Sequence, residues 1–167
     1  KTFSEEIQED PKNAFAYYGQ GLLFGRMDRE KEAVKYLKEA IQRRPLDPDI
    51  YRDLGKTYFQ IGDYSNALKI LKGVLAYSPK DRKAWFLVGR AQMETGDLQG
   101  ATGSFETLMT ISPEDLSGMY YLGQVYGKQG NLEEAHYYLG IYYQRKGEFK
   151  NATFHLNRAL KLASKDN

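Results

Sequence analysis

The chain has 167 residues, 41% of them hydrophobic and 28% charged, with a formal net charge of +2, which is typical of a single soluble helical domain. No apolar run approaches the roughly 18 residues that cross a bilayer, so direct membrane insertion is excluded, and so small a net charge predicts no general attraction to nucleic acid or anionic lipid. The absence of cysteine excludes disulfides and thiolate metal sites and leaves the compartment open.

A constant spacing of 34 residues organises most of the sequence. A fixed period in this range marks a stack of supersecondary units, and such stacks usually present a binding surface. Four series keep the spacing: Pro11, Pro45, Pro79 and Pro113; Gly21, Gly55, Gly89 and Gly123; Ala33, Ala67, Ala101 and Ala135; and Leu37, Leu71, Phe105 and Leu139.

The first segment, residues 1–12, differs from the units that follow. Phe3, Ile7 and Pro11 fit the end of a second helix from an earlier hairpin. We therefore expect this segment to be the tail of a preceding repeat whose helix begins before Lys1. Because the sequence shows neither an initiator methionine nor a signal-peptide pattern, we expect the chain to be a fragment of a longer protein.

Residues 47–80 show what one unit contains. Asp47 can cap a first helix by accepting orphan backbone N–H groups, and Gly62 can end that helix in the left-handed conformation. Asp63 can then cap a second helix, which Pro79 prevents from continuing. The apolar positions recur at helical spacing; they are Tyr51, Leu54, Gly55 and Tyr58, then Ala67, Leu68, Leu71, Val74 and Leu75. The unit is predicted to be a helical hairpin.

The other units follow the same pattern, and no strand is expected. The first is looser, because Gln20 replaces an apolar residue and Asp28 replaces the loop glycine. The predicted repeats are residues 13–46, 47–80, 81–114 and 115–147, followed by a C-terminal capping helix at 148–167.

Gly55 and its equivalents lie inside helices, where glycine costs roughly 1 kcal/mol relative to alanine. We interpret them as points of close approach, at which the partner helix lies nearer than the usual 8–10 Å or so. A bulky replacement there is expected to cost about 1–3 kcal/mol through overpacking.

Towards the C-terminus the period halves. Gly123 is followed by Gly140 after 17 residues, and Gly130 by Gly147 after another 17. The helix at about 132–146 is therefore predicted to have two roles, as second helix of the fourth hairpin and as first helix for the segment beyond it.

Together these residues resemble the tetratricopeptide repeat. The residues that carry the resemblance are Tyr51, Leu54, Gly55, Tyr58, Gly62, Tyr64, Ala67, Leu71 and Pro79 in the second unit, Trp85, Val88, Gly89, Gly96, Ala101, Phe105 and Pro113 in the third, and Met119, Leu122, Gly123, Tyr126, Gly130, Ala135 and Leu139 in the fourth. The resemblance implies an all-α fold, a right-handed α-solenoid of about four hairpins with a concave groove lined by the first helices.

Catalytic motifs are absent from the sequence. His136 and His155 are the only histidines, 19 residues apart on separate predicted helices, and we interpret them as surface or helix-end residues. There is no His-Glu-x-x-His and no phosphate-binding loop. No enzyme activity, metal or cofactor is predicted.

The groove is the candidate binding site. Its expected residues combine aromatic rings with arginine and lysine, and rings and arginine are enriched at interface hot spots. They are Tyr18, Leu22, Arg52, Lys56, Phe59, Lys83, Phe86, Arg90, Met93, Tyr120, Gln124 and Tyr137, within a wider trough that adds Phe15, Arg26, Lys128, Ile141 and Gln144. We expect a protein or peptide partner with apolar side chains and a carboxylate. The alternative is that several of the rings only pack between hairpins.

The residues of the expected groove argue against the binding of chaperone C-termini, a ligand known for the tetratricopeptide repeat family. A carboxylate clamp for chaperone C-termini requires lysine, asparagine and arginine at positions that here hold Tyr18, Leu22, Asp53, Lys83 and Leu87. Since only Lys83 fits, this ligand is disfavoured.

The C-terminal stretch suggests two alternatives to a stand-alone interaction module. Residues 135–160 are similar to the end of bacterial membrane-associated zinc metalloproteases of the β-barrel-assembly-enhancing type. That resemblance implies a recognition domain in the envelope or periplasm, separate from its catalytic domain; otherwise a cytoplasmic location is expected. Tyr137, Tyr138, Tyr142 and Tyr143 crowd one helix, so a homodimer through the C-terminal helices is the third hypothesis.

Overall fold

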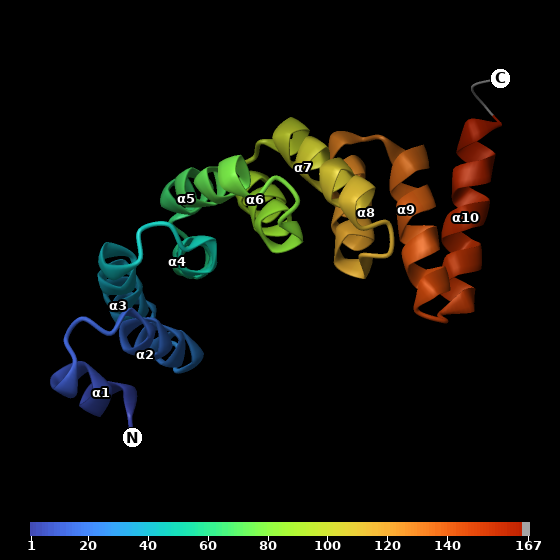
Figure 1. The fold of residues 1–167 in the computed structure, drawn as a ribbon. Coiled ribbons are helices and arrows are strands. Elements are labelled where there is room, and N and C mark those ends of the chain that lie inside the picture. Colours follow the sequence, from blue (N-terminus) through green and yellow to red (C-terminus); the bar gives the residue numbers. More distant parts are fainter. Residues whose placement is uncertain (165–167) are drawn as a thin grey trace. The chain divides into compact units, whose positions relative to one another are not determined.

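The computed structural model describes residues 1–164, which form ten helices joined by short turns and contain no strand (Figure 1). The all-α class is thus confirmed. The helices are α1 (Phe3–Glu9), α2 (Ala14–Arg26), α3 (Glu30–Arg43), α4 (Pro48–Ile61), α5 (Tyr64–Tyr77), α6 (Arg82–Glu94), α7 (Leu98–Ile111), α8 (Leu116–Gln129), α9 (Leu132–Arg145) and α10 (Phe149–Ala163). Within the described residues, none of these helices combines the length and the apolar character that crossing a membrane requires.

The chain divides into two compact units, Lys1–Leu87 and Val88–Asn167, with the division inside α6. In the first unit α2 packs against α3 and α4 against α5, and α3 and α4 join the two hairpins. In the second unit α7 packs on α8, α8 on α9, and α9 on α10. Each unit is therefore a short stack of neighbouring antiparallel helices.

Local sequence determines where these helices begin and end. Asp47 caps α4 by accepting from the backbone N–H two residues later, and Asp63 caps α5 in a similar way. Gly62 ends α4 at φ 85°, in the left-handed region, as the sequence predicted. Asp28 adopts the same region at φ 54°, which confirms that it replaces the loop glycine of the first hairpin. Aspartate tolerates this conformation better than most residues with a Cβ.

The helix glycines mark the points of close approach. A Cβ placed on each of them would lie under 3 Å from the partner helix, closer than packed atoms allow. The nearest partner atoms are in Leu37 for Gly21 (2.9 Å), Leu71 for Gly55 (2.7 Å), Phe105 for Gly89 (2.8 Å), Leu139 for Gly123 (2.9 Å) and Leu156 for Gly140 (2.7 Å). Gly140 on α9 thus approaches Leu156 of α10 as Gly123 on α8 approaches Leu139 of α9.

The N-terminal helix α1 is capped at Thr2. Thr2 and Glu5 form a capping box, in which each side chain accepts a hydrogen bond from the other residue's backbone N–H, at 3.2 and 2.8 Å. The Phe3 ring covers Gly19 of α2, where an added Cβ would collide with the ring. The segment therefore packs on the first hairpin.

Buried apolar side chains fill the space between the helices. In the first unit Leu37, Ala40, Ile50 and Leu54 form a cluster between the first two hairpins. In the second unit Phe105, Leu108, Leu122 and Val125 are fully buried. These residues fix the packed faces of the first helices, so the remaining faces are available to carry a functional surface.

Candidate functional site

The site begins with two first helices of the first unit, α2 and α4. Tyr18 on α2 donates its hydroxyl hydrogen to Asp53 Oδ2 on α4 at 2.5 Å. Burial and this carboxylate raise the pKa of Tyr18 above its ordinary range. Tyr18 therefore links the two helices and is a half-buried part of the site rather than a freely exposed ring.

Arg52 on α4 is held within the protein. Its guanidinium lies 2.6 Å from Asp49 and 2.7 Å from Asp81, and only 17% of the side chain is exposed. Burial opposes the charged form of Arg52, but the hydrogen bonds that Arg52 donates to Asp81 and Asp49 outweigh this effect and raise its pKa. Asp81 also accepts from the backbone N–H of Ala84 at the start of α6, at 3.0 Å. Arg52 thus joins consecutive hairpins instead of offering an open charge to a ligand.

A pocket of about 270 Å³ lies between α2 and α4. The structure brings Leu22 and Lys56 of the expected groove together there, with Arg26 of the wider trough beside them. The full lining consists of Gly21, Leu22, Gly25, Arg26, Leu37, Asp53, Lys56, Thr57 and Gln60. Asp53, Thr57 and Gln60 were not among the predicted groove residues, although their spacing of four and three residues places them on one helix face.

The other expected residues of the first unit lie outside the pocket. Phe59 packs against Tyr64 across its own hairpin, with ring centroids 5.4 Å apart. Lys83 is exposed near the start of α6, and Phe86 is half-buried one turn later. Hence only part of the predicted set shares one cavity.

In the second unit the expected residues make contacts between neighbouring helices. Arg90 donates to the Tyr121 hydroxyl at 2.7 Å and lies 4.5 Å from the centre of that ring. Tyr120 packs on Tyr142 of α9, with ring centroids 5.1 Å apart. Met93 and Gln124 are half-buried on α6 and α8, whereas Tyr137 on α9 is 51% exposed.

All four crowded tyrosines of α9 have ring partners inside the unit, and Tyr137 packs edge-on against Tyr138 of the same helix. Tyr138 stacks on Tyr126, Tyr142 packs on Tyr120, and Tyr143 stacks on His155. Burial, followed by the carboxylate of Glu106, raises the pKa of Tyr138. Tyr137 is the member of the four that remains half exposed.

The interpretation of the histidines as separate surface residues was wrong. His136 and His155 are half-buried and their Nδ1 atoms lie 2.9 Å apart. The antiparallel arrangement of α9 and α10 about the turn at Gly147 brings them together. Burial lowers the pKa of both residues. No group of three or more metal-ligating side chains occurs among residues 1–164.

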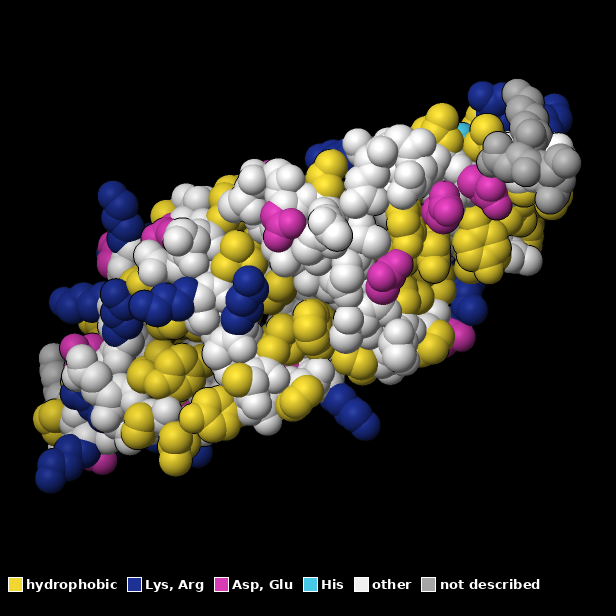
Figure 2. All heavy atoms as spheres, turned by 90° about the horizontal axis from the view of Figure 1, so that it is seen from above, with side chains coloured by type: hydrophobic (Ala, Val, Ile, Leu, Met, Phe, Trp, Pro, Cys, Tyr) yellow, Lys and Arg dark blue, Asp and Glu magenta, His cyan; other side chains and the backbone are white. Residues whose placement is uncertain are grey.

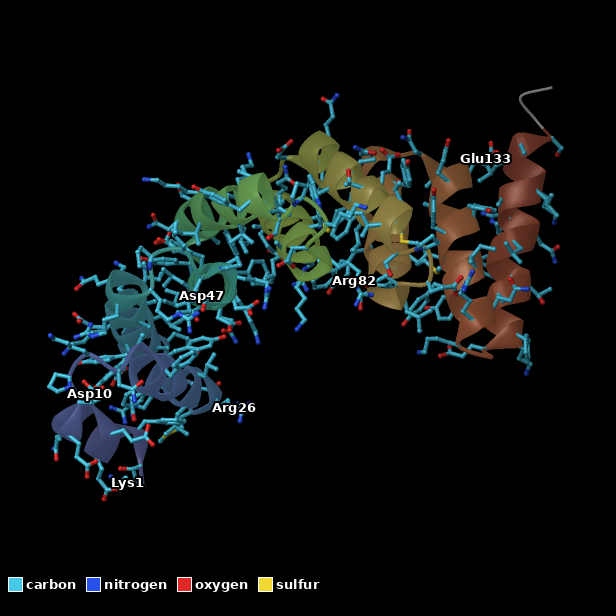
Figure 3. All side chains as sticks on the ribbon, viewed as in Figure 1. Lys1, Asp10, Arg26, Asp47, Arg82 and Glu133 are labelled. Atoms are coloured by element: carbon cyan, nitrogen blue, oxygen red, sulfur yellow. The ribbon has the colours of Figure 1, made fainter. Side chains whose placement is uncertain are left out.

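On the face shown in Figure 2, hydrophobic side chains lie among charged ones of both signs, and Lys and Arg gather mainly towards the left of the view. Figure 3 places Arg26 at the C-terminal end of α2, where its side chain is exposed at the pocket.

Comparison with known families gives matches in both parts of the chain. The family description "tetratricopeptide repeat" matches residues 27–91 and 62–102, and a second description of the same name matches residues 133–166. Together these matches span well over half of the sequence. No curated relative matches it.

Several solved structures have the same fold. YrrB, described as a TPR protein with an unusual peptide-binding site, is 22% identical with a TM-score of 0.77, over 91% of this chain and 78% of that one. MamA is 18% identical with a TM-score of 0.71, over 98% and 86%. The first TPR of Spaghetti (RPAP3), bound to the HSP90 peptide SRMEEVD, is 16% identical with a TM-score of 0.68, over 72% and 96%. At these identities the likeness shows the solenoid fold alone.

Proposed function

Because the chain belongs to the tetratricopeptide repeat family, we propose that it is a non-catalytic interaction module that binds a peptide or an extended protein segment along its first helices. The observation that carries this proposal is the recurrence of half-buried aromatic rings at one first-helix position, in Tyr18, Phe86 and Tyr120. Aromatic side chains of this kind supply much of the energy at protein interfaces. Two of the similar structures, YrrB and Spaghetti, are described with a peptide-binding site or a bound peptide.

Each unit supplies its own share of the surface. In the first unit the pocket beside Leu22 takes one ligand side chain, and the exposed Lys56 and Lys83 favour acidic partners. In the second unit Tyr120 and Met93 offer apolar contact. Recognition by such short clusters suits an extended segment, which presents successive side chains at regular intervals.

The proposal can be tested by selecting peptides from a displayed random library on the immobilised chain. The affinity of a selected peptide is then measured by fluorescence anisotropy for two variants. Phe86→Ala on α6 should weaken binding about tenfold or more, the loss typical of a hot-spot ring. Tyr77→Ala is the matched control, since Tyr77 is an aromatic residue that is 83% exposed on a second helix. Equal effects of the two variants, or no selected peptide, would refute the proposal.

A narrower form of this function would place the module in a larger bacterial envelope metalloprotease, where it would present substrate or an assembly partner to the catalytic domain. The double role of α9, marked by the contact of Gly140 with Leu156, supports the comparison with that C-terminal region. The natural gene tests it directly: an upstream His-Glu-x-x-His helix is required. Self-association is a further candidate, for which the half-exposed Tyr137 is the contact to mutate.

A further inference from the structure

The pocket between α2 and α4 combines an apolar floor with a charged mouth. Gly21 and Leu37 are buried, and Leu22 and Gly25 are half-buried beside them. Arg26, Lys56 and Gln60 are exposed at the same pocket. Its volume of about 270 Å³ is below the range of about 300–1,000 Å³ for small-molecule sites, so it suits a single side chain of a larger ligand.

The residues on the two helices explain why the pocket is not filled by side chains. Gly25 brings no side chain to the pocket, and even an added Cβ there would meet only Ala33, at 3.9 Å. On the opposite side, Thr57 is turned to its own helix, because its hydroxyl donates to the Asp53 carbonyl at 2.8 Å. The cavity is therefore a consequence of small or locally bonded residues on both first helices.

The charges at the pocket are unequal. Asp53 is its single carboxylate and already accepts the hydrogen bond from Tyr18. Arg26 and Lys56 form no ion pair with any residue in the part of the chain that the structure describes. Two cations without an ion-pair partner and one carboxylate therefore line the pocket, which leaves an excess of one positive charge. Long basic side chains of this kind can keep their heads in water while their methylene stems cover apolar surface.

We propose that this pocket binds a glutamate or aspartate side chain of the peptide ligand; the inference rests on the proposed function and specifies its chemistry. The ligand carboxylate accepts hydrogen bonds from the Arg26 guanidinium and the Lys56 ammonium, which are charge-assisted contacts. The methylene groups of the ligand lie against Leu22 and Gly25. Neither cation occupies a position of the carboxylate clamp, so the pocket is distinct from that clamp.

The test uses a small molecule that mimics one glutamate residue of a peptide and can bind in the pocket alone. The ¹⁵N-labelled chain is titrated with N-acetyl-glutamate methylamide while the amide resonances of Gly21, Gly25 and Thr57 are followed by NMR. The glutamate fragment should shift them with a Kd on the order of tens of millimolar, because two exposed ion pairs contribute at most about 2 kcal/mol. The glutamine analogue and inorganic phosphate at equal ionic strength should not. No shift with glutamate, or equal shifts with either control, overturns the proposal.

Two variants identify the cations. Arg26→Gln and Lys56→Gln should each weaken glutamate binding about two- to fivefold, the range of exposed ion pairs. Lys72→Gln is the matched control, since Lys72 is exposed on α5 and lies outside the pocket. All three changes are at the surface, and thermal unfolding confirms that each variant is folded. An equal loss in the Lys72 variant would contradict the assignment.

The fragment and the peptide library separate the two proposals. If library peptides bind but the glutamate fragment leaves the pocket resonances unchanged, the pocket assignment is wrong and the interaction function stands. If the glutamate fragment binds and no peptide is selected, the pocket does bind a carboxylate and the peptide-binding function is wrong.

Discussion

Replacing Gly55 with alanine tests the packing that generates the hairpins. The new Cβ would lie 2.7 Å from Leu71 Cγ and 2.8 Å from Leu71 Cδ2, and Leu71 is completely buried. Overpacking of this kind costs about 1–3 kcal/mol, whereas removing a glycine from a helix interior gains about 1 kcal/mol. Gly55→Ala should therefore lower the free energy of unfolding by up to about 2 kcal/mol.

Gly73→Ala is the control for this prediction. Gly73 lies in α5, on the partner helix of the same hairpin, and an added Cβ there meets nothing within 4 Å. Because the gain in helix propensity is common to both variants, the difference between them isolates the overpacking cost of about 1–3 kcal/mol.

Urea unfolding followed by tryptophan fluorescence provides the assay. Trp85 is the single tryptophan of the chain and lies in the first unit, where it donates to the Pro79 carbonyl at 2.8 Å. In a Leu71→Ala background, Gly55→Ala should become stabilising, because the clashing side chain is gone. If Gly55→Ala stabilises the natural chain as much as Gly73→Ala does, the close-approach explanation is refuted.

Three further predictions concern other parts of the structure. Asp28→Gly should raise the free energy of unfolding by up to about 1 kcal/mol in urea, because glycine has no Cβ penalty at positive φ; a loss would contradict this. Burial lowers the pKa of His136 and His155 in the folded state, so the unfolded state takes up protons at a higher pH than the folded state does. The free energy of unfolding should therefore fall as the pH drops below about 6.5. His155→Gln should reduce that slope between about pH 7.5 and 5.5; an unchanged slope would show that the pair is not responsible. Arg52→Gln should lower the free energy of unfolding by about 1–2 kcal/mol, less than the loss of a fully buried ion pair. A double-mutant cycle with Asp81→Asn, measured by urea unfolding, should show coupling between the two residues. Additive effects would refute a stabilising Arg52–Asp81 ion pair.

Much of the fold could be predicted because it is determined locally. Asp47 and Gly62 fix the ends of α4 through their own side chain or backbone conformation, and the 34-residue spacing carries the same rules to the other hairpins. Even the departure at Asp28 follows the rule, since it takes the conformation of the glycine that it replaces. Gly140 could be interpreted in the same way, because its spacing repeats the contact of the preceding helix.

The partners of polar side chains could not be predicted from the repeat. Tyr18 and Asp53 are 35 residues apart, and Arg52 and Asp81 are 29 apart, so neither pair joins equivalent positions. Whether Arg52 points to a ligand or to a carboxylate of the next hairpin depends on its rotamer and on residues that differ between units. The pairing of His136 with His155 likewise requires the antiparallel register of α9 and α10, which periodicity alone does not supply.

Hydrogen exchange of the chain with and without a library-selected peptide tests the central claim most directly, namely that the first helices form the binding surface. Mass spectrometry resolves segments within α2 and α4 from segments within α3 and α5. Binding should slow exchange in α2 and α4 and leave the second helices α3 and α5 close to their unbound rates. Protection confined to α3 and α5 would contradict the claim.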